Sequence, residues 1–193
     1  MHFYILAGGK SRRFGRNKAL FVMEGKSIIE CVAAAIPPEQ KIFIVTNSPA
    51  EYAHFPWPLL PDHYPGSGPL AGIHAGLTHS PGEWNFFLAC DFPCLKSSVI
   101  NELLAAPRNA QVILPETTAG LQPLCALWSQ SALPAVENAL QNHDLRLHAV
   151  LAKLALHVIL PTDPQALYNL NTPEDLNNLP PHFPEMRKMA DAA

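Results

Sequence analysis

The stretch MHFYILAGGKSRRFGRNKAL, residues 1–20, joins a predicted strand to a basic loop. Its apolar, β-prone run at 2–7 leads directly into a loop that contains Gly8, Gly9 and Gly15. The same loop holds five of the chain's 13 lysines and arginines, at positions 10, 12, 13, 16 and 18. Because the whole chain has a formal net charge of −3, this positive charge is local. A basic loop with so bare a backbone indicates a small anionic ligand.

Apolar runs like the first one recur along the sequence, and helix-like stretches separate most of them. This alternation is typical of an α/β domain with a mostly parallel central sheet and helices on both faces. The continuously apolar strands fit a sheet that is buried on both sides. The runs at 110–115 and 121–128, joined by a short TTAG link, predict an antiparallel hairpin within that sheet. The expected strands are 2–7, 41–46, 58–61, 84–89, 110–115, 124–128 and 156–161, and the expected helices are 27–36, 70–78, 97–105, 130–141 and 144–154.

The length of 193 residues predicts one domain, which we place at residues 1–179, followed by a proline-rich and then polar tail at 180–193 that we expect to be loosely ordered. The hydrophobic content of 48% supports a sizeable core, and the mild acidity argues against a nucleic-acid or anionic-membrane partner. The four cysteines lack the spacing of a zinc site. With neither a signal-peptide pattern nor an apolar run of about 20 residues, we expect a cytoplasmic protein.

In an open parallel sheet, ligands bind beyond the carboxyl ends of the strands, which is where the loop after the first strand lies. Two common glycine loops are excluded. A P-loop would need a glycine where Tyr4 stands, and a dinucleotide fingerprint would need GxGxxG, whereas Gly8 and Gly9 are followed by the next glycine at 15. A nucleoside triphosphate suits the bare N–H groups and the basic side chains. The alternative is a basic surface loop without a ligand.

The first loop also resembles the signature of a known family. LAGGKSRRFGRNKAL, residues 6–20, is similar to the LAGGxSxRMGxDK motif of the nucleotidyltransferases, in particular the MobA-like molybdenum cofactor guanylyltransferases. Further motifs occur in the family's order along about 180 residues. They are PD ending at Asp62, GPLAGIHAGL at 68–77, ACDFP at 89–93, QPLCALW at 122–128 and NLNTPEDL at 169–176.

The resemblance implies a single-domain, Rossmann-like nucleotidyltransferase fold and a specific reaction. Family members transfer GMP from GTP to the terminal phosphate of molybdenum-molybdopterin, forming the guanine dinucleotide cofactor and releasing pyrophosphate. The resemblance further implies Mg²⁺ as cofactor and an attack of the pterin's phosphate on the α-phosphorus of GTP. GTP and molybdopterin are then the substrates, and transient contact with molybdenum-insertion and molybdoenzyme maturation proteins is expected.

The catalytic residues are expected around the first loop and the fourth strand. Asp91 follows the run at 84–89, and a carboxylate at the carboxyl end of a strand is well placed to hold Mg²⁺ on substrate phosphates. Lys18 matches the family's phosphate-binding lysine, and Arg12 and Arg13 match basic family positions, either of which could contact phosphate. The alternatives are that Asp91 only caps a turn and that Lys18 is a solvated lysine at a helix start.

A second group of residues matches the family's nucleotide site. Asp62 matches an aspartate of that site, although it could equally cap the turn that follows it. Gly68 gives its loop the freedom to close over a ligand. A polar family residue near the ribose and base falls at Thr46 or Asn47. The resemblance implies a nucleotide-binding set of Leu6, Ala7, Gly8, Gly9, Lys18, Thr46, Asn47, Asp62, Gly68 and Asp91.

The pterin end of the site is expected near the C-terminus. Asn169 and Asn171 precede Thr172, which is typical of a helix N-cap with Glu174 and Asp175 in the first turn. Alternate residues on a strand point the same way, so both amides could face one ligand. The family uses this segment at the pterin end, and Arg146 matches a family arginine that could meet the pterin phosphate. Turn formation is the alternative role for the two asparagines.

One departure from the family pattern bears on function. Where the pattern has Asp-Lys, this chain has Asn17-Lys18, which removes one carboxylate from the phosphate region. Rival interpretations are a cytidylyltransferase acting on the same pterin, another small-molecule nucleotidyltransferase, and a non-catalytic nucleotide-binding regulator. Because the first loop reads LAGG rather than the LAAG of the cytidylyl relatives, we expect GTP to be preferred over CTP and ATP.

Overall fold

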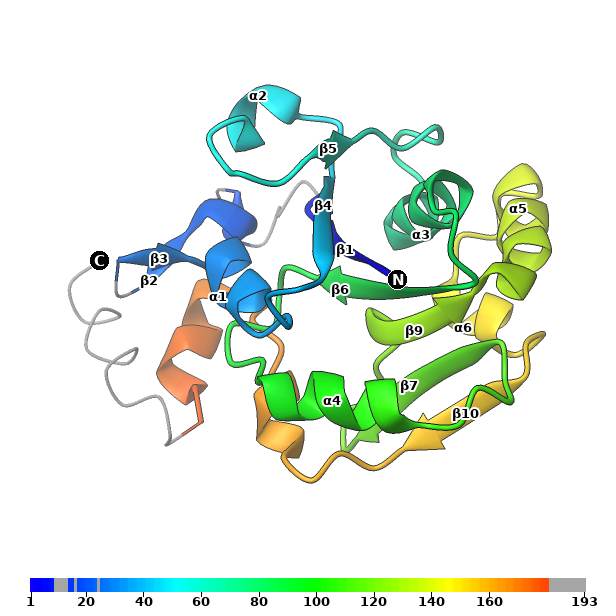
Figure 1. The fold of residues 1–193 in the computed structure, drawn as a ribbon. Coiled ribbons are helices and arrows are strands. Elements are labelled where there is room, and N and C mark those ends of the chain that lie inside the picture. Colours follow the sequence, from blue (N-terminus) through cyan, green and yellow to red (C-terminus); the bar gives the residue numbers. More distant parts are fainter. Residues whose placement is uncertain (9–13, 16, 24, 181–193) are drawn as a thin grey trace.

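A computed structural model describes residues 1–8, 14–15, 17–23 and 25–180. Its central sheet has the strand order β10-β7-β9-β6-β1-β4-β5 (Figure 1). Neighbours in this order are parallel except at β9, which runs antiparallel to both β6 and β7. The sheet is therefore mostly parallel, as the sequence predicts. The strands are β1 (His2–Leu6), β4 (Lys41–Val45), β5 (Leu59–Leu60), β6 (Trp84–Ala89), β7 (Val112–Thr117), β9 (Cys125–Ser129) and β10 (Leu156–Ile159).

The predicted hairpin lies on the side of β6 opposite to β1. Strand β7 continues into a short β8 (Gly120–Leu121) that pairs back onto it, and β9 then pairs with β7 through Val112 and Trp128. Gly120 has φ +95°, a left-handed conformation that L-residues rarely adopt and that the tight turn requires. The hairpin is the reason that one antiparallel strand interrupts the sheet.

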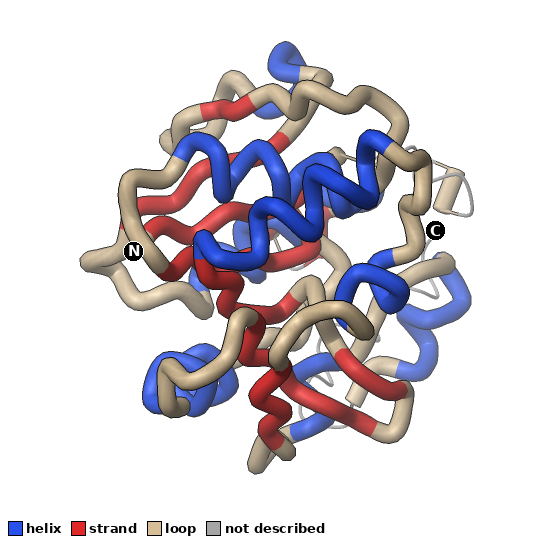
Figure 2. Tube along the Cα trace, turned by 90° about the vertical axis from the view of Figure 1, so that its right-hand side faces the viewer, coloured by secondary structure: helices blue, strands red, loops and turns tan. Residues whose placement is uncertain are grey.

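Helices cover both faces of the sheet (Figures 1 and 2). One face carries α1 (Ile28–Ala34) and α4 (Ser97–Ala105), and the other carries α3 (Pro69–His79), α5 (Leu133–Gln141) and α6 (Leu147–Leu151). The helix expected at 130–141 begins as a 3₁₀ turn over Gln130–Ala132, and Pro134 lies in the first turn of α5, where its missing N–H is tolerated. The helix expected at 144–154 is shorter than predicted.

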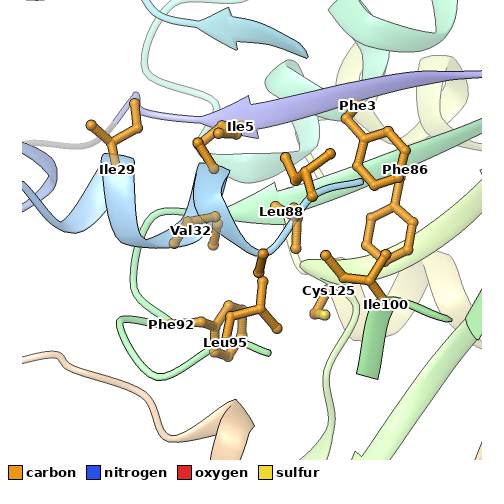
Figure 3. Close-up of a cluster of buried hydrophobic side chains, with 14 of the residues drawn as sticks. Phe3, Ile5, Ile29, Val32, Phe86, Leu88, Phe92, Leu95, Ile100 and Cys125 are labelled. Carbon is orange, nitrogen blue, oxygen red and sulfur yellow. The ribbon is translucent and has the colours of Figure 1, made fainter. Parts of the chain in front are cut away.

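The core follows the alternation of side chains along the central strands. Phe3 of β1 and Phe86 of β6 point toward α1 and α4, and their rings stack with centroids 4.9 Å apart (Figure 3). Tyr4 and Phe87 point to the opposite face, where α3 packs. Both faces of each central strand are thus buried, which explains why their sequences are continuously apolar.

A third, smaller cluster joins the C-terminal segment to the N-terminal part of the chain. It forms beside a two-stranded hairpin of β2 (Val22–Met23) and β3 (Lys26–Ser27), which the sequence did not predict. Thr172 caps the 3₁₀ helix over Pro173–Asn178 with Asp175, so the predicted N-cap is confirmed. The buried members are Phe14, Met23, Ile28, Cys94, Leu170, Leu176 and Leu179.

All four cysteines are free thiols. Within the residues that the structure describes, no helix is both long and apolar enough to cross a bilayer. The tail expected to be loosely ordered falls mostly at 181–193, outside the described residues.

The contact between α3 and the sheet generates a stability prediction. A Cβ at Gly76 would clash with the buried ring of Phe87, whereas a Cβ at Gly72 would meet the flexible end of Leu6 at 2.8 Å. We expect Gly76→Ala to lower the free energy of unfolding by about 1–2 kcal/mol, since overpacking outweighs the gain in helix propensity. Urea unfolding measures the loss. An equal or smaller loss than in Gly72→Ala would contradict this packing.

Candidate functional site

A pocket of about 200 Å³ lies at the carboxyl ends of β1 and β6. Parallel strands that end side by side leave their loops at one edge of the sheet, and ligands of such folds bind there. The pocket therefore lies where the sequence predicts a ligand for the first loop. Its lining consists of Leu6, Gly8, Asn17, Lys18, Pro69, Ala89, Cys90, Asp91 and Leu124.

Asp91 is the carboxylate of this pocket. It lies two residues beyond the end of β6, and 21% of its side chain is exposed. Burial raises the pKa of Asp91 above its ordinary value, and the positive charge of Lys18 opposes that rise. The Asp91 carboxyl group thus lies in a partly desolvated place, close to the ammonium of Lys18.

Lys18 supplies that cation from the first loop. Its Nζ lies 3.7 Å from Oδ2 of Asp91 and donates a hydrogen bond of 2.6 Å to the carbonyl of Leu170. Lys18 begins a 3₁₀ turn over Lys18–Leu20, and the Asn17 side chain caps this turn by accepting from the Ala19 N–H at 3.2 Å. Only 13% of the lysine side chain is exposed, so it is a pocket residue rather than a solvated surface lysine.

The C-terminal segment closes onto the same carboxylate. The Leu170 N–H donates to the Asp91 carbonyl at 2.9 Å. The Asn169 amide, oriented with its nitrogen toward Asp91, donates to Oδ2 at 2.9 Å. Leu170 itself is buried in the third cluster, which holds the segment in place. Asp91 is therefore the point where three segments of the chain meet.

The structure separates the residues that the sequence assigned to the pterin. Asn169 lies on Asp91, whereas Asn171 is exposed and its N–H donates to the Asp175 side chain. Residues 169–171 do not form a regular strand, so the expected alternation does not apply to them. Arg146 is 81% exposed and pairs with Asp144 at 2.9 Å, and it does not line the pocket.

The expected nucleotide residues at β4 and β5 form a separate pair. The Asn47 amide donates to Oδ2 of Asp62 at 2.9 Å and accepts from the Asp62 N–H at 3.1 Å. Asp62 also accepts from the Tyr64 N–H, as a turn cap would. Thr46 is 3% exposed and accepts from the Ser48 N–H. The polar family residue was expected at Thr46 or Asn47, and of these two Asn47 is exposed whereas Thr46 is buried.

The other sequence-predicted residues divide between the pocket and the undescribed part of the loop. Leu6 and Gly8 line the pocket, and Ala7 follows β1 directly. Gly68, with φ +67°, precedes α3, whose first residue Pro69 also lines the pocket. Gly9, Arg12 and Arg13 lie outside the described residues.

Sequence reasoning missed several pocket residues. Leu124, Pro69 and Cys90 each belong to a motif that resembles the family, namely QPLCALW, GPLAGIHAGL and ACDFP. The motifs were noted in the sequence, but no role was assigned to these three residues. Burial raises the pKa of Cys90 to about 12, so its thiol stays protonated and is not a nucleophile at neutral pH. Among the described residues, the charged groups of the pocket are Lys18 and Asp91, with the amides of Asn17 and Asn169 beside them.

The sequence of this chain is similar to sequences described as probable molybdenum cofactor guanylyltransferases. A probable molybdenum cofactor guanylyltransferase of Clostridium perfringens strain ATCC 13124 is 34% identical over 91% of this chain and 93% of that protein. A protein with the same description from Deinococcus radiodurans is 38% identical over 91% of each chain.

Solved structures give the same fold. A molybdopterin-guanine dinucleotide biosynthesis protein A from Archaeoglobus fulgidus superposes with a TM-score of 0.81 over 100% of both chains, at 23% identity. At that identity the likeness concerns the fold alone. The sequence also matches the family described as the MobA-like NTP transferase domain over residues 3–158, which is most of its length. The chain therefore belongs to the MobA-like NTP transferase family.

Proposed function

We propose that this protein transfers GMP from GTP to the terminal phosphate of molybdenum-molybdopterin, releasing pyrophosphate. The observation that carries the proposal is the pairing of Lys18 with Asp91 in a pocket at the carboxyl ends of β1 and β6. The relatives described as molybdenum cofactor guanylyltransferases support it, since they match over nearly their whole length. The same proposal includes a cytoplasmic location, where GTP is available, and transient contact with proteins that insert molybdenum or receive the cofactor.

Lys18 is the group that we assign to the triphosphate. An ammonium suits phosphate oxygens as a point charge, and negative charge grows on the departing pyrophosphate as the α-phosphorus accepts its new oxygen. Bound phosphate would replace the Leu170 carbonyl as a partner of Nζ. The basic residues at 10, 12, 13 and 16 would add positive charge along the same loop.

Asp91 is the residue that would hold Mg²⁺. Among the described residues, no group of three or more His, Cys, Asp or Glu side chains could bind a metal by itself. A single carboxylate nevertheless fits Mg²⁺, which is commonly held by one or two carboxylates together with substrate phosphates and water. When bound there, the ion would neutralise phosphate charge. Asn169 fixes the carboxylate by donating to its Oδ2.

The remaining expected residues take roles at the two ends of the site. Asp62, oriented by Asn47, offers carboxylate oxygens to the N1–H and N2–H₂ donors of guanine. Leaving such an acceptor unpaired with adenine would cost about 1–3 kcal/mol. We keep Asn169, Asn171 and Arg146 as pterin residues. The position of Asn169 at Asp91 suits this role, because the acceptor phosphate must reach the α-phosphorus.

The reaction is tested with purified protein, Mg²⁺, molybdopterin carrying molybdenum, and each of GTP, CTP and ATP in turn. We expect pyrophosphate release and dinucleotide formation to be fastest with GTP, because guanine presents a donor edge that the other bases lack. Faster turnover with CTP would make the protein a cytidylyltransferase. GTP binding without release of pyrophosphate would make it a nucleotide-binding regulator.

Removal of the Lys18 charge provides a second prediction. We expect Lys18→Ala to raise the KM for GTP and to lower kcat, because the ammonium contacts phosphate in both the ground state and the transition state. Lys41→Ala is the control, since Lys41 is an exposed residue at the start of β4. Steady-state kinetics with both variants decide the matter. Unchanged kinetics in Lys18→Ala would remove the lysine from the site.

The buried charge of Asp91 provides a third prediction, in which activity and stability move differently. We expect Asp91→Asn to lower kcat at least about a hundredfold, because an amide is a poor Mg²⁺ ligand. Burial raises the pKa of Asp91, so its ionised form disfavours folding at pH 7.5, and the variant should melt no lower than the parent.

Asp163→Asn is the matched control for Asp91→Asn. Lys96, 2.7 Å away, lowers the pKa of Asp163, so the ionised form stabilises the fold above the unfolded-state pKa. Its replacement should therefore lower stability at pH 7.5, by about 1 kcal/mol or less, and leave turnover intact. An Asp91→Asn variant that melts well below the parent, or that keeps its activity, would contradict the assignment.

A further inference from the structure

The hydroxyl of Tyr52 lies at the centre of a buried polar network beside the pocket. Tyr52 ends the short helix α2 (Pro49–Tyr52) and is 1% exposed. Its oxygen lies 3.0 Å from the Ala7 carbonyl and 3.2 Å from Oδ1 of Asn17, and it accepts from Nδ2 of Asn17 at 3.0 Å. The hydroxyl has one proton, so it donates to one of the two carbonyl oxygens at a time.

These partners lie at the two ends of the basic loop. Ala7 comes directly after β1, and its N–H donates to the Val45 carbonyl. Asn17 directly precedes Lys18 and caps the 3₁₀ turn that presents the lysine. The tyrosine hydroxyl therefore bridges Ala7, where the chain leaves β1, and Asn17, which caps the 3₁₀ turn of Lys18.

Asn17 also contacts Glu51, and this contact explains why an amide rather than a carboxylate suits position 17. Its Nδ2 donates to Oε2 of Glu51 at 2.6 Å, in addition to Tyr52. An aspartate at position 17 could still cap Ala19, but it has no N–H to donate to Glu51. Two carboxylates at this distance would repel each other. The side chains around position 17 are thus arranged for an amide.

We propose that Tyr52 is a positioning residue for Lys18, acting through Asn17, and that Glu51 makes an amide at position 17 necessary. This inference rests on the proposed function and deepens it by naming what sets the phosphate-binding lysine. A hydroxyl suits the task because it accepts from one group while donating to another. Burial raises the pKa of Tyr52 to about 12, so the group keeps its proton throughout the physiological range.

The test compares Tyr52→Phe with Tyr4→Phe. Tyr4 is also fully buried, and its hydroxyl is also hydrogen-bonded, to His79 at 3.0 Å near the start of β1. Each variant removes one hydroxyl and keeps the ring. We expect Tyr52→Phe to speed amide hydrogen exchange in peptides covering residues 14–23 about tenfold and to lower kcat/KM for GTP by a similar factor. Tyr4→Phe should change neither at the same fraction folded.

Residue 17 provides the second measurement. We expect Asn17→Asp to lower kcat/KM for GTP about tenfold, since it places two carboxylates together. Adding Glu51→Gln restores the hydrogen bond with donor and acceptor exchanged, so the double variant should regain most of the loss. Such rescue would not occur if either side chain only filled space.

Three outcomes would overturn the inference. They are unchanged exchange at 14–23 in Tyr52→Phe, an equal effect in Tyr4→Phe, and failure of Glu51→Gln to rescue Asn17→Asp. The exchange measurement needs no substrate, so it reports on the positioning network even if the parent protein fails to transfer GMP. Failure of the proposed function and failure of this inference are thereby distinguished.

Discussion

The ammonium of Lys18 lies between the Asp91 carboxylate and the Leu170 carbonyl, and the rest of the site depends on this contact. Lys18 and Leu170 are 152 positions apart in the sequence. The contact therefore requires the parallel sheet, which ends β1 and β6 side by side, and the third apolar cluster, which carries the C-terminal segment back to the pocket. Apolar packing has no directional preference, but here it positions polar groups whose hydrogen bonds are directional.

The site combines groups whose separate burial would be unfavourable. Asp91 is partly desolvated, and within the described part of the chain Lys18 and the amide of Asn169 only partly compensate its charge. Such an arrangement is typical of functional sites, where a charged group is kept in place for a ligand rather than for the fold. A nucleoside triphosphate with Mg²⁺ would compensate both charges, because its phosphate oxygens would contact the Lys18 ammonium and the metal ion would contact the Asp91 carboxylate.

The sequence was informative where a local pattern determines the structure. The apolar run of β1, the glycines after it and the aspartate after β6 indicated the place of the pocket and named Asp91, whereas Lys18 was named from the resemblance of the first loop to the family motif. Local patterns could not reveal contacts that depend on the tertiary fold. Nothing in PAEY at 49–52 indicates that Tyr52 meets Asn17, and nothing near Asn169 indicates that its amide meets Asp91. The two-residue strands β2 and β3 were missed because so short a pairing leaves no periodicity.

We propose that phosphate chemistry takes place at the carboxyl ends of β1 and β6. Paramagnetic relaxation by Mn²⁺ with GTP, measured on the backbone amides of ¹⁵N-labelled protein, tests it most directly. We predict the strongest broadening at Leu6, Asp91 and Leu170, and clearly weaker broadening at His2 and Trp84. These two residues lie at the other ends of β1 and β6, about 13 Å from Leu6 and about 17 Å from Ala89 at ~3.3 Å per residue. Broadening centred on that other end, or none at all with GTP bound, would contradict the account.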